Sequence, residues 1–288
     1  MNQALYAQLL VGLINGSFYA LLSLGLAVIF GMLNIINFAH GALYMMGAFV
    51  AYFLLNLLGL NYWWALLLSP LAVGCFGMLL ERTMLHRLAG LDHLYGLLLT
   101  FGFALIIQGV FQNYFGSSGL PYAIPPLLQG GFNLGFMYLP TYRAWVVLFS
   151  LLTCLATWFL IERTKLGAYL RAATENPVMV RAFGINVPLM LTLTYGLGVA
   201  LAAVAGVLSA PINQVRPLMG ADVVIVVFAV VVIGGMGSIM GSIITGFSLG
   251  IVEGLTKYFY PEASNTVVFV LMVLVLLLKP AGLTGRTA

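Results

Sequence analysis

Charged side chains are scarce in this sequence. Lys and Arg number 11 and Asp and Glu number 7 among 288 residues, so 6% of the chain is charged and 62% is hydrophobic. A soluble domain has about 25% charged residues, and a chain this apolar cannot cover the surface of a soluble fold. A soluble globular protein is therefore excluded. The remaining classes are membrane-spanning helices and closed barrels, because only these satisfy backbone polar groups in lipid.

Polar interruptions inside the apolar runs are also few, which excludes a barrel. Barrel strands alternate apolar and polar residues, whereas residues 223–233 and 267–278 are continuously apolar. We therefore predict an all-α polytopic transmembrane bundle, formed by residues 1–288 as a single transmembrane domain with about eight or nine membrane segments. A crossing takes about 20 apolar residues. The predicted segments are 5–31, 35–58, 62–80, 94–115, 142–161, 189–212, 222–235, 238–258 and 265–279, of which the seventh is short enough to be a half-helix.

Residues that carry enzymatic or metal chemistry are nearly absent. The two cysteines, Cys75 and Cys154, have no CxxC partner, and the three histidines lack the spacing of a metal site. No GxxxxGK[ST] phosphate-binding loop occurs. The few basic residues lie between apolar spans and do not form a nucleic-acid surface. We predict no catalytic residue, no metal, no cofactor and no nucleic-acid partner.

The distribution of basic residues predicts the orientation of the chain. If every segment crosses, eight of the eleven share one side: Arg82, Arg87, Arg163, Lys165, Arg171, Arg181, Lys279 and Arg286. The positive-inside rule makes that side cytoplasmic. The loop at 162–188 and the C-terminus are then cytoplasmic, and the N-terminus is outside.

Polar residues interrupt the apolar pattern between residues 34 and 41. Asn34, Asn37 and His40 stand near Phe38 and Gly41 in otherwise apolar sequence. Polar side chains within a membrane are costly unless they face a cavity or a partner. One interpretation is a discontinuous helix that lines a solute pathway. The other is a short cytoplasmic turn in which Asn34 or Asn37 caps a helix.

Glycine marks further features of the spans. Gly234, Gly235 and Gly237 form either a tight turn or an unwound helix near the pathway. Small residues spaced four apart predict two seams where helices pack closely: glycine and alanine at 198–210, and glycine at 246–254. Among polar residues within spans, Gln108 either contacts solute or bridges helices, and Glu253 lies one turn from Lys257, which favours a local ion pair.

The loop between the fifth and sixth segments predicts two short helices that meet at a corner. Asn176 suits an N-cap, Pro177 the first helical position and Gly184 the stop after Phe183. Phe183 and Ile185 give this basic loop an apolar tip, which indicates docking to a soluble partner. A surface helix on lipid headgroups is the alternative.

Several short motifs occur in a particular order along nearly the whole chain. They are Asn34-Ile35-Ile36-Asn37-Phe38-Ala39-His40-Gly41, Arg171-Ala172, Asn176, Gly184-Ile185-Asn186, Ala203-Val204-Ala205-Gly206-Val207, Gly234-Gly235-Met236-Gly237-Ser238, Pro280-Ala281-Gly282-Leu283 and Gly285-Arg286. In this order and spacing the chain resembles LivH-type permease subunits of the ABC importers for branched-chain amino acids. That group also includes permeases for urea, amides and other small acids.

The resemblance implies a translocation subunit of the bacterial inner membrane that works by alternating access. It implies a second, LivM-like permease subunit, two ATP-binding subunits and a periplasmic solute-binding protein. The break at 34–40 becomes the favoured pathway element. Residues implied in docking to the ATPase within the coupling segment 162–188 are Arg171, Asn176, Pro177, Arg181, Phe183, Gly184 and Ile185. Pathway candidates are Asn34, Asn37, Phe38, His40, Gln108, Gly234, Gly235 and Gly237.

Other functions stay open at this point. The chain could serve a related importer of urea, amides or small organic acids. A stand-alone channel or ion-coupled carrier needs buried charges or a constriction that works without partners, and it leaves the corner at 176–185 unexplained. Two positions depart from the family pattern: Leu88 follows Arg87 where proline is usual, and Asp222 stands where a basic or small residue is common.

Overall fold

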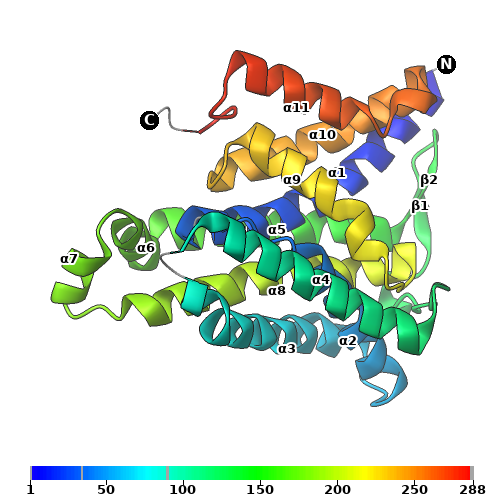
Figure 1. Cartoon of the computed structure of the whole chain (residues 1–288). Coiled ribbons are helices and arrows are strands. Elements are labelled where there is room, and N and C mark those ends of the chain that lie inside the picture. Colours follow the sequence, from blue (N-terminus) through cyan, green and yellow to red (C-terminus); the bar gives the residue numbers. More distant parts are fainter. Residues whose placement is uncertain (1, 34, 89–90, 286–288) are drawn as a thin grey trace.

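The computed structural model describes residues 2–33, 35–88 and 91–285 (Figure 1). Its α-helices are α1 (Asn2–Leu33), α2 (His40–Asn56), α3 (Tyr62–Thr83), α4 (His93–Phe115), α5 (Thr141–Arg163), α6 (Lys165–Glu175), α7 (Pro177–Ala182), α8 (Val187–Asn213), α9 (Met219–Gly234), α10 (Ile239–Phe259) and α11 (Val267–Leu278). Short 3-10 helices are η1 (Leu85–Leu88), η2 (Pro126–Leu128) and η3 (Pro261–Ala263). A hairpin joins β1 (Gly131–Asn133) to β2 (Tyr138–Pro140), with Phe132 opposite Leu139.

The predicted helical membrane bundle is confirmed, and each predicted segment contains a helix. Within the described ranges, six helices are long and apolar enough to cross a membrane, namely α1, α3, α4, α5, α8 and α10. The other three, α2, α9 and α11, have 17, 16 and 12 residues. The expected eight or nine segments therefore divide into six long helices and three shorter ones. The second predicted segment also differs, because its helix begins at His40 and not at residue 35.

The two ends of the bundle differ in character. Figure 1 shows α6 and α7 at the left end, where α11 also finishes, and the β1–β2 hairpin at the right end, where α1 starts. We call these the α7 end and the hairpin end. The start of α1 and the finish of α11 therefore lie at opposite ends, as an odd number of crossings requires. Arg286 and the pathway candidate Asn34 lie outside the described residues.

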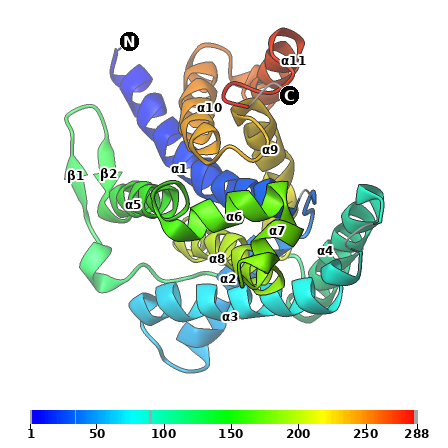
Figure 2. The ribbon, with the colours of Figure 1, turned by 90° about the vertical axis from the view of Figure 1, so that its left-hand side faces the viewer.

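Helices α1 and α8 form the centre of the bundle. Their most apolar stretches are 72% buried, against 17% for α4 and 28% for α5, and α4 stands at the edge of the bundle in Figure 2. The predicted glycine seams explain the close packing. A methyl group on Gly250 would overlap the backbone of Gly16 in α1, and one on Gly206 would overlap the Tyr44 carbonyl in α2. The seams in α8 and α10 are thus confirmed as helix contacts.

The glycine motif after α9 is a tight turn and not an unwound helix. Gly235 and Gly237 have φ angles of 106° and 81°, values that favour glycine, and Ser238 Oγ caps α10 by accepting from the Gly241 amide at 3.1 Å. The chain after α11 folds back onto this turn, where Thr284 Oγ1 donates to the Gly234 carbonyl at 2.6 Å. The turn therefore anchors the last described residues to the α7 end.

Candidate functional site

The segment 35–39 is a break between α1 and α2 that returns into the bundle. His40 Nε2 lies 3.0 Å from the carbonyl of Leu22, which is eleven residues before the end of α1. That separation is about 16 Å of helix at 1.5 Å per residue. The non-helical chain must cover that distance before α2 starts. The membrane crossing that contains α2 is therefore discontinuous: residues 35–37 have no regular secondary structure, residues 38–39 form a turn, and the helix begins at His40.

Buried hydrogen bonds hold the segment 35–39 in place. The fully buried Asn37 donates from Nδ2 to the Tyr195 hydroxyl of α8 at 3.1 Å, and its Oδ1 accepts from the Ala39 amide at 3.1 Å. The Phe38 amide donates to Thr100 Oγ1 of α4 at 3.1 Å. Backbone groups at this depth have no water to pair with. Asn37 does not cap α2, whose N-cap is Ala39 without a side-chain hydrogen bond; it holds the non-helical segment against Tyr195 and the Ala39 amide.

His40 fixes the start of α2 against α1. A carbonyl only accepts, so Nε2 carries the proton toward Leu22 and Nδ1 is the unprotonated acceptor. Nδ1 is buried and has no partner among the described atoms. Gly25 permits this arrangement, because a Cβ there would lie 3.1 Å from the imidazole Cε1. His40 is therefore a buried side chain held between α1 and α2, and its place in the pathway stays a prediction.

Two hollows approach the break from opposite ends of the bundle. At the hairpin end, the polar hollow is bounded by α1, α2, α9 and the end of α8, and it reaches Leu22 and Tyr44. At the α7 end, a second hollow is lined by Ile35 and by the loop that contains His86 and Asp92. A groove between α2, α4 and α9 lies beside them and includes Phe38 and Gln108. Residues 35–44 thus separate a hollow at one end from a hollow at the other.

The structure brings together only some of the predicted pathway residues. Phe38 and Gln108 share the lateral groove, where the Phe38 ring packs against Phe228 at 4.7 Å between centroids. The Gln108 amide makes no hydrogen bond to another described residue, so it does not bridge helices within that part of the chain. Asn37 and His40 lie behind the groove in the core. The three glycines at 234, 235 and 237 lie instead at the α7 end, against the C-terminal turn and the end of α1.

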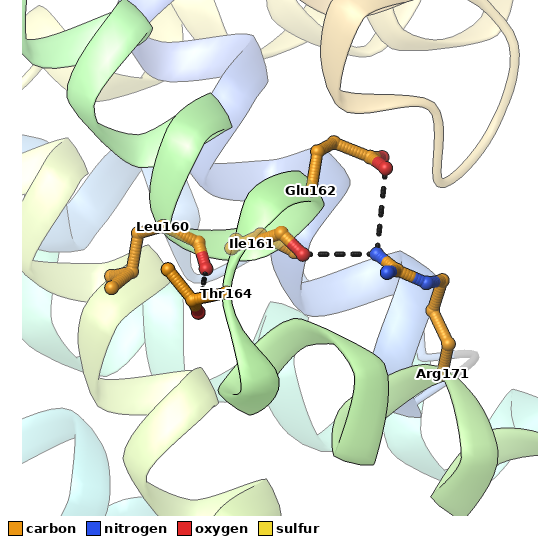
Figure 3. Close-up of polar contacts among 5 residues, drawn as sticks. All are labelled: Leu160, Ile161, Glu162, Thr164 and Arg171. Carbon is orange, nitrogen blue, oxygen red and sulfur yellow. Dashed lines mark hydrogen bonds and ion pairs between the residues drawn. The ribbon is translucent and has the colours of Figure 1, made fainter.

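The corner of the predicted coupling segment is built at the end of α5. Arg171 Nη1 donates to the Ile161 carbonyl at 2.9 Å and pairs with Glu162 Oε2 at 3.4 Å, while Thr164 Oγ1 donates to the Leu160 carbonyl (Figure 3). The last carbonyls of a helix lack partners within it. Arg171 and Thr164 satisfy two of them, which fixes how α6 leaves α5.

The second short helix matches its prediction closely. Asn176 Oδ1 accepts from the Met179 amide at 3.0 Å, Pro177 is the first residue of α7, and Gly184 follows with a φ of 80°. Helix α7 ends at Ala182, one residue before the predicted end. Figure 2 shows α6 and α7 across the face of the α7 end.

The tip of this corner is apolar and exposed. Phe183 is 79% exposed, Val178 74% and Met179 60%. Met179, Phe183 and Ile185 also line a hollow between α6 and α7. We use the name docking surface for the apolar patch at which the sequence predicts docking, and define it as Val178, Met179, Phe183 and Ile185. Arg181 is exposed on the same short helix.

Two carboxylates in the predicted membrane segments form ion pairs. Lys257 Nζ lies 2.5 Å from Glu253 Oε1, which confirms the predicted local pair, and the Tyr19 hydroxyl donates to Glu253 Oε2 at 2.8 Å. Asp222 pairs with Arg216 at 2.8 Å across the start of α9. The sequence did not predict this second pair, since five residues, the first of them Pro217, separate its members.

A buried carboxylate, Glu81, was also not predicted from the sequence. Glu81 in α3 is 2% exposed and accepts from Thr192 Oγ1 of α8 at 2.6 Å. Glu81 directly follows the predicted segment 62–80 and precedes Arg82, so no feature of the sequence marked it as buried. Among the described residues, no three His, Cys, Asp or Glu side chains could hold a metal ion.

Comparison with known proteins decides the family. Residues 8–276 match the family model described as "Branched-chain amino acid transport system / permease component". The chain belongs to this permease family. The match confirms the resemblance inferred from the sequence motifs, and it makes the chain a permease component of a transport system and not an enzyme.

Members of the permease family align with nearly the whole chain. The high-affinity branched-chain amino acid transport system permease protein LivH of Escherichia coli K12 is 31% identical, over 97% of this chain and 95% of LivH. The corresponding protein BraD of Pseudomonas aeruginosa is 32% identical over the same shares. LivM, a permease protein of the same E. coli system, is 30% identical over 93% of this chain and 68% of LivM. No solved structure matches the chain.

Proposed function

We propose that the chain is a membrane-spanning permease subunit of an ATP-driven importer and that it carries branched-chain amino acids inward by alternating access. The observation that carries the proposal is the discontinuous crossing at 35–44, which lies between two hollows at opposite ends of a member of this permease family. Irregular backbone at membrane depth is tolerated where it is buried in protein or lines a cavity. A small shift of this segment would open one hollow and close the other.

The energy for this shift must come from another chain, since the sequence has no phosphate-binding loop. We assign the docking of one of the two ATP-binding subunits to the coupling segment 162–188. Its apolar docking surface is exposed, while Arg171, Asn176, Pro177 and Gly184 shape the corner that presents it. Arg181 adds a positive charge beside Phe183.

Two further partners complete the proposed importer. A second, LivM-like permease subunit is supported by the similarity of this chain to both LivH and LivM of one E. coli system. A periplasmic solute-binding protein would deliver the amino acid. Helix α4 exposes most of its apolar surface and needs lipid or a subunit to cover it.

We place the chain in the bacterial inner membrane with the α7 end in the cytoplasm. The support is the positive-inside rule. Arg163 ends α5, Lys165, Arg171 and Arg181 lie in α6 and α7, and Lys279 follows α11, so these basic residues gather at that end (Figure 1). The C-terminus is then cytoplasmic and residues 1–288 act as one permease domain.

Reconstitution tests this function. Proteoliposomes that contain the chain, its permease partner and the ATP-binding subunits should accumulate radiolabelled leucine only with internal ATP and external binding protein. Omission of the ATP-binding subunits is the matched control and should abolish uptake. Uptake by this polypeptide alone, without ATP, would contradict the proposal and favour a channel or an ion-coupled carrier.

A further inference from the structure

The polar hollow at the hairpin end contains an ion pair that packing does not require. Arg216 Nη2 lies 2.8 Å from Asp222 Oδ2, and the two side chains are 48% and 50% exposed. A pair that water reaches adds only about 0–1 kcal/mol to stability. In so weakly charged a chain, stability alone does not explain two opposite charges inside one hollow.

Both members of this pair keep unused hydrogen-bonding capacity. A guanidinium has five N–H donors, and Arg216 uses one of them, toward Asp222 Oδ2, in the part of the chain that the structure describes. The other carboxylate oxygen, Asp222 Oδ1, accepts no hydrogen bond from a described residue. The hollow thus presents free donors of positive charge beside a free acceptor of negative charge.

The neighbouring polar groups are neutral and also partly unused. The Asn15 amide lines the hollow and has no hydrogen-bond partner among the described residues. The Asn213 Nδ2 group donates to Ser209 Oγ at 3.0 Å, which leaves its carbonyl oxygen available. With one positive and one negative side chain among its lining residues, the hollow carries no net charge.

Apart from these groups and the hydroxyl-bearing side chains of Tyr19 and Tyr44, the hollow is lined by apolar residues. Phe18, Leu22 and Met219 are buried side chains on its wall, and Val223 adjoins them. Such a surface suits a branched aliphatic group next to a charged head. The hollow also reaches Leu22, whose carbonyl holds His40 at the broken crossing. A molecule bound there would lie directly against the segment that separates the two hollows.

We propose that the polar hollow is a binding site for the zwitterionic head of an aliphatic α-amino acid, with Arg216 on its carboxylate and Asp222 on its ammonium group. This inference rests on the proposed transport function and names the recognition site within it. The guanidinium fork matches a carboxylate, and Asp222 Oδ1 matches an ammonium donor. Uncharged urea or amides would make neither charged interaction, and an anion without an ammonium group would leave Asp222 Oδ1 without a donor.

Direct binding to the full chain in lipid nanodiscs tests the site. Saturation-transfer NMR would compare leucine with leucinamide, which lacks the carboxylate, and with the α-keto acid of leucine, which lacks the ammonium group. The variants are Arg216→Gln and Asp222→Asn. The control is Glu262→Gln, which removes an exposed carboxylate from η3, outside the hollow.

We expect wild type and Glu262→Gln to bind leucine equally and to prefer it over both analogues. Each hollow variant should bind leucine about tenfold more weakly or worse, the scale of one lost hydrogen bond to a charged group. Arg216→Gln should also lose the preference for leucine over leucinamide. Leucine affinities within twofold of wild type in both variants, or no saturable binding to wild type, would overturn the site.

The two proposals fail in different experiments. Wild-type uptake of leucine with ATP, combined with full uptake by Arg216→Gln and Asp222→Asn, overturns the site and leaves the importer function standing. Leucine binding that depends on Arg216 and Asp222, without ATP-driven uptake by the reconstituted complex, overturns the function and leaves the site standing. Elution of each variant at the wild-type volume in gel filtration establishes that the comparison is between folded chains.

Discussion

The hydrogen bond between Asn37 and Tyr195 gives the sharpest test of how the broken crossing is held. Both side chains are fully buried, and Asn37 Nδ2 donates to the Tyr195 hydroxyl at 3.1 Å. Tyr195→Phe removes one oxygen and leaves the ring in place. The amide donor then has no acceptor at a depth that water does not reach. The expected result is a lower free energy of unfolding without a change of fold.

The expected loss in the free energy of unfolding follows from measurements on comparable hydrogen bonds. An unsatisfied buried donor costs about 1–3 kcal/mol in soluble proteins, whereas hydrogen bonds between membrane helices average about 0.6 kcal/mol and reach about 1.7. We expect a loss of about 1 kcal/mol for Tyr195→Phe. Asn37→Ala should lose about 1 kcal/mol more, because Asn37 Oδ1 also accepts from the Ala39 amide. The double variant should lose less than the sum of the two.

Equilibrium unfolding in mixed micelles, titrated with denaturing detergent, measures these differences. The matched control is Tyr114→Phe, since the Tyr114 side chain is 78% exposed and makes no hydrogen bond to a described residue. A Tyr195→Phe variant as stable as the Tyr114→Phe control would refute the reasoning. Additive losses in the double variant would do so as well, because they would show that the two side chains act independently.

Two further predictions concern the docking surface and the packing seam. Phe183→Ala should weaken binding of the purified ATP-binding subunit to the chain by about tenfold or more, since burial of a Phe side chain is worth about 1.5–3 kcal/mol. Biolayer interferometry measures the affinity. The control is Leu277→Ala, which changes a similarly exposed apolar side chain in α11 and should leave the affinity unchanged. An equal loss in both variants would contradict a specific surface. Gly250→Leu should prevent recovery of a monodisperse protein, because its side chain would enter the backbone of α1, whereas Gly102→Ala, with open space around its Cβ, should purify like wild type. Normal yield of Gly250→Leu would show that the seam is not close-packed.

Much of the fold could be predicted because lipid leaves the chain few choices. Continuous apolar runs must become helices, and Asn176, Pro177 and Gly184 each have a local preference that sets the bounds of α7. The packing seam that contains Gly250 followed from residue spacing in the same way, although the spacing did not identify α1 as its partner. These features depend on short stretches of sequence, so periodicity and capping rules suffice to find them.

The candidate site was less predictable because its contacts join distant segments. The break at 35–39 was visible in the sequence, but its return to Leu22 depends on a bond from His40 to another helix. The Arg216–Asp222 pair explains the unusual Asp222: the carboxylate stands beside a guanidinium and adds no net charge to the hollow. A carboxylate at this position is therefore compatible with a zwitterionic solute.

Helix α8 provides a physical route from the docking surface to the break. It begins at Val187, directly after the corner, where Asn186 Oδ1 accepts from the Leu189 amide at 3.2 Å. Tyr195 follows eight residues after Val187, about 12 Å along the helix, and holds Asn37. If an ATP-binding subunit moves α7 as proposed, α8 would carry the movement to the segment 35–39 as a rigid body. Tyr195→Phe should then lower leucine uptake more than ATP hydrolysis in the reconstituted importer, and equal losses of both would contradict this route.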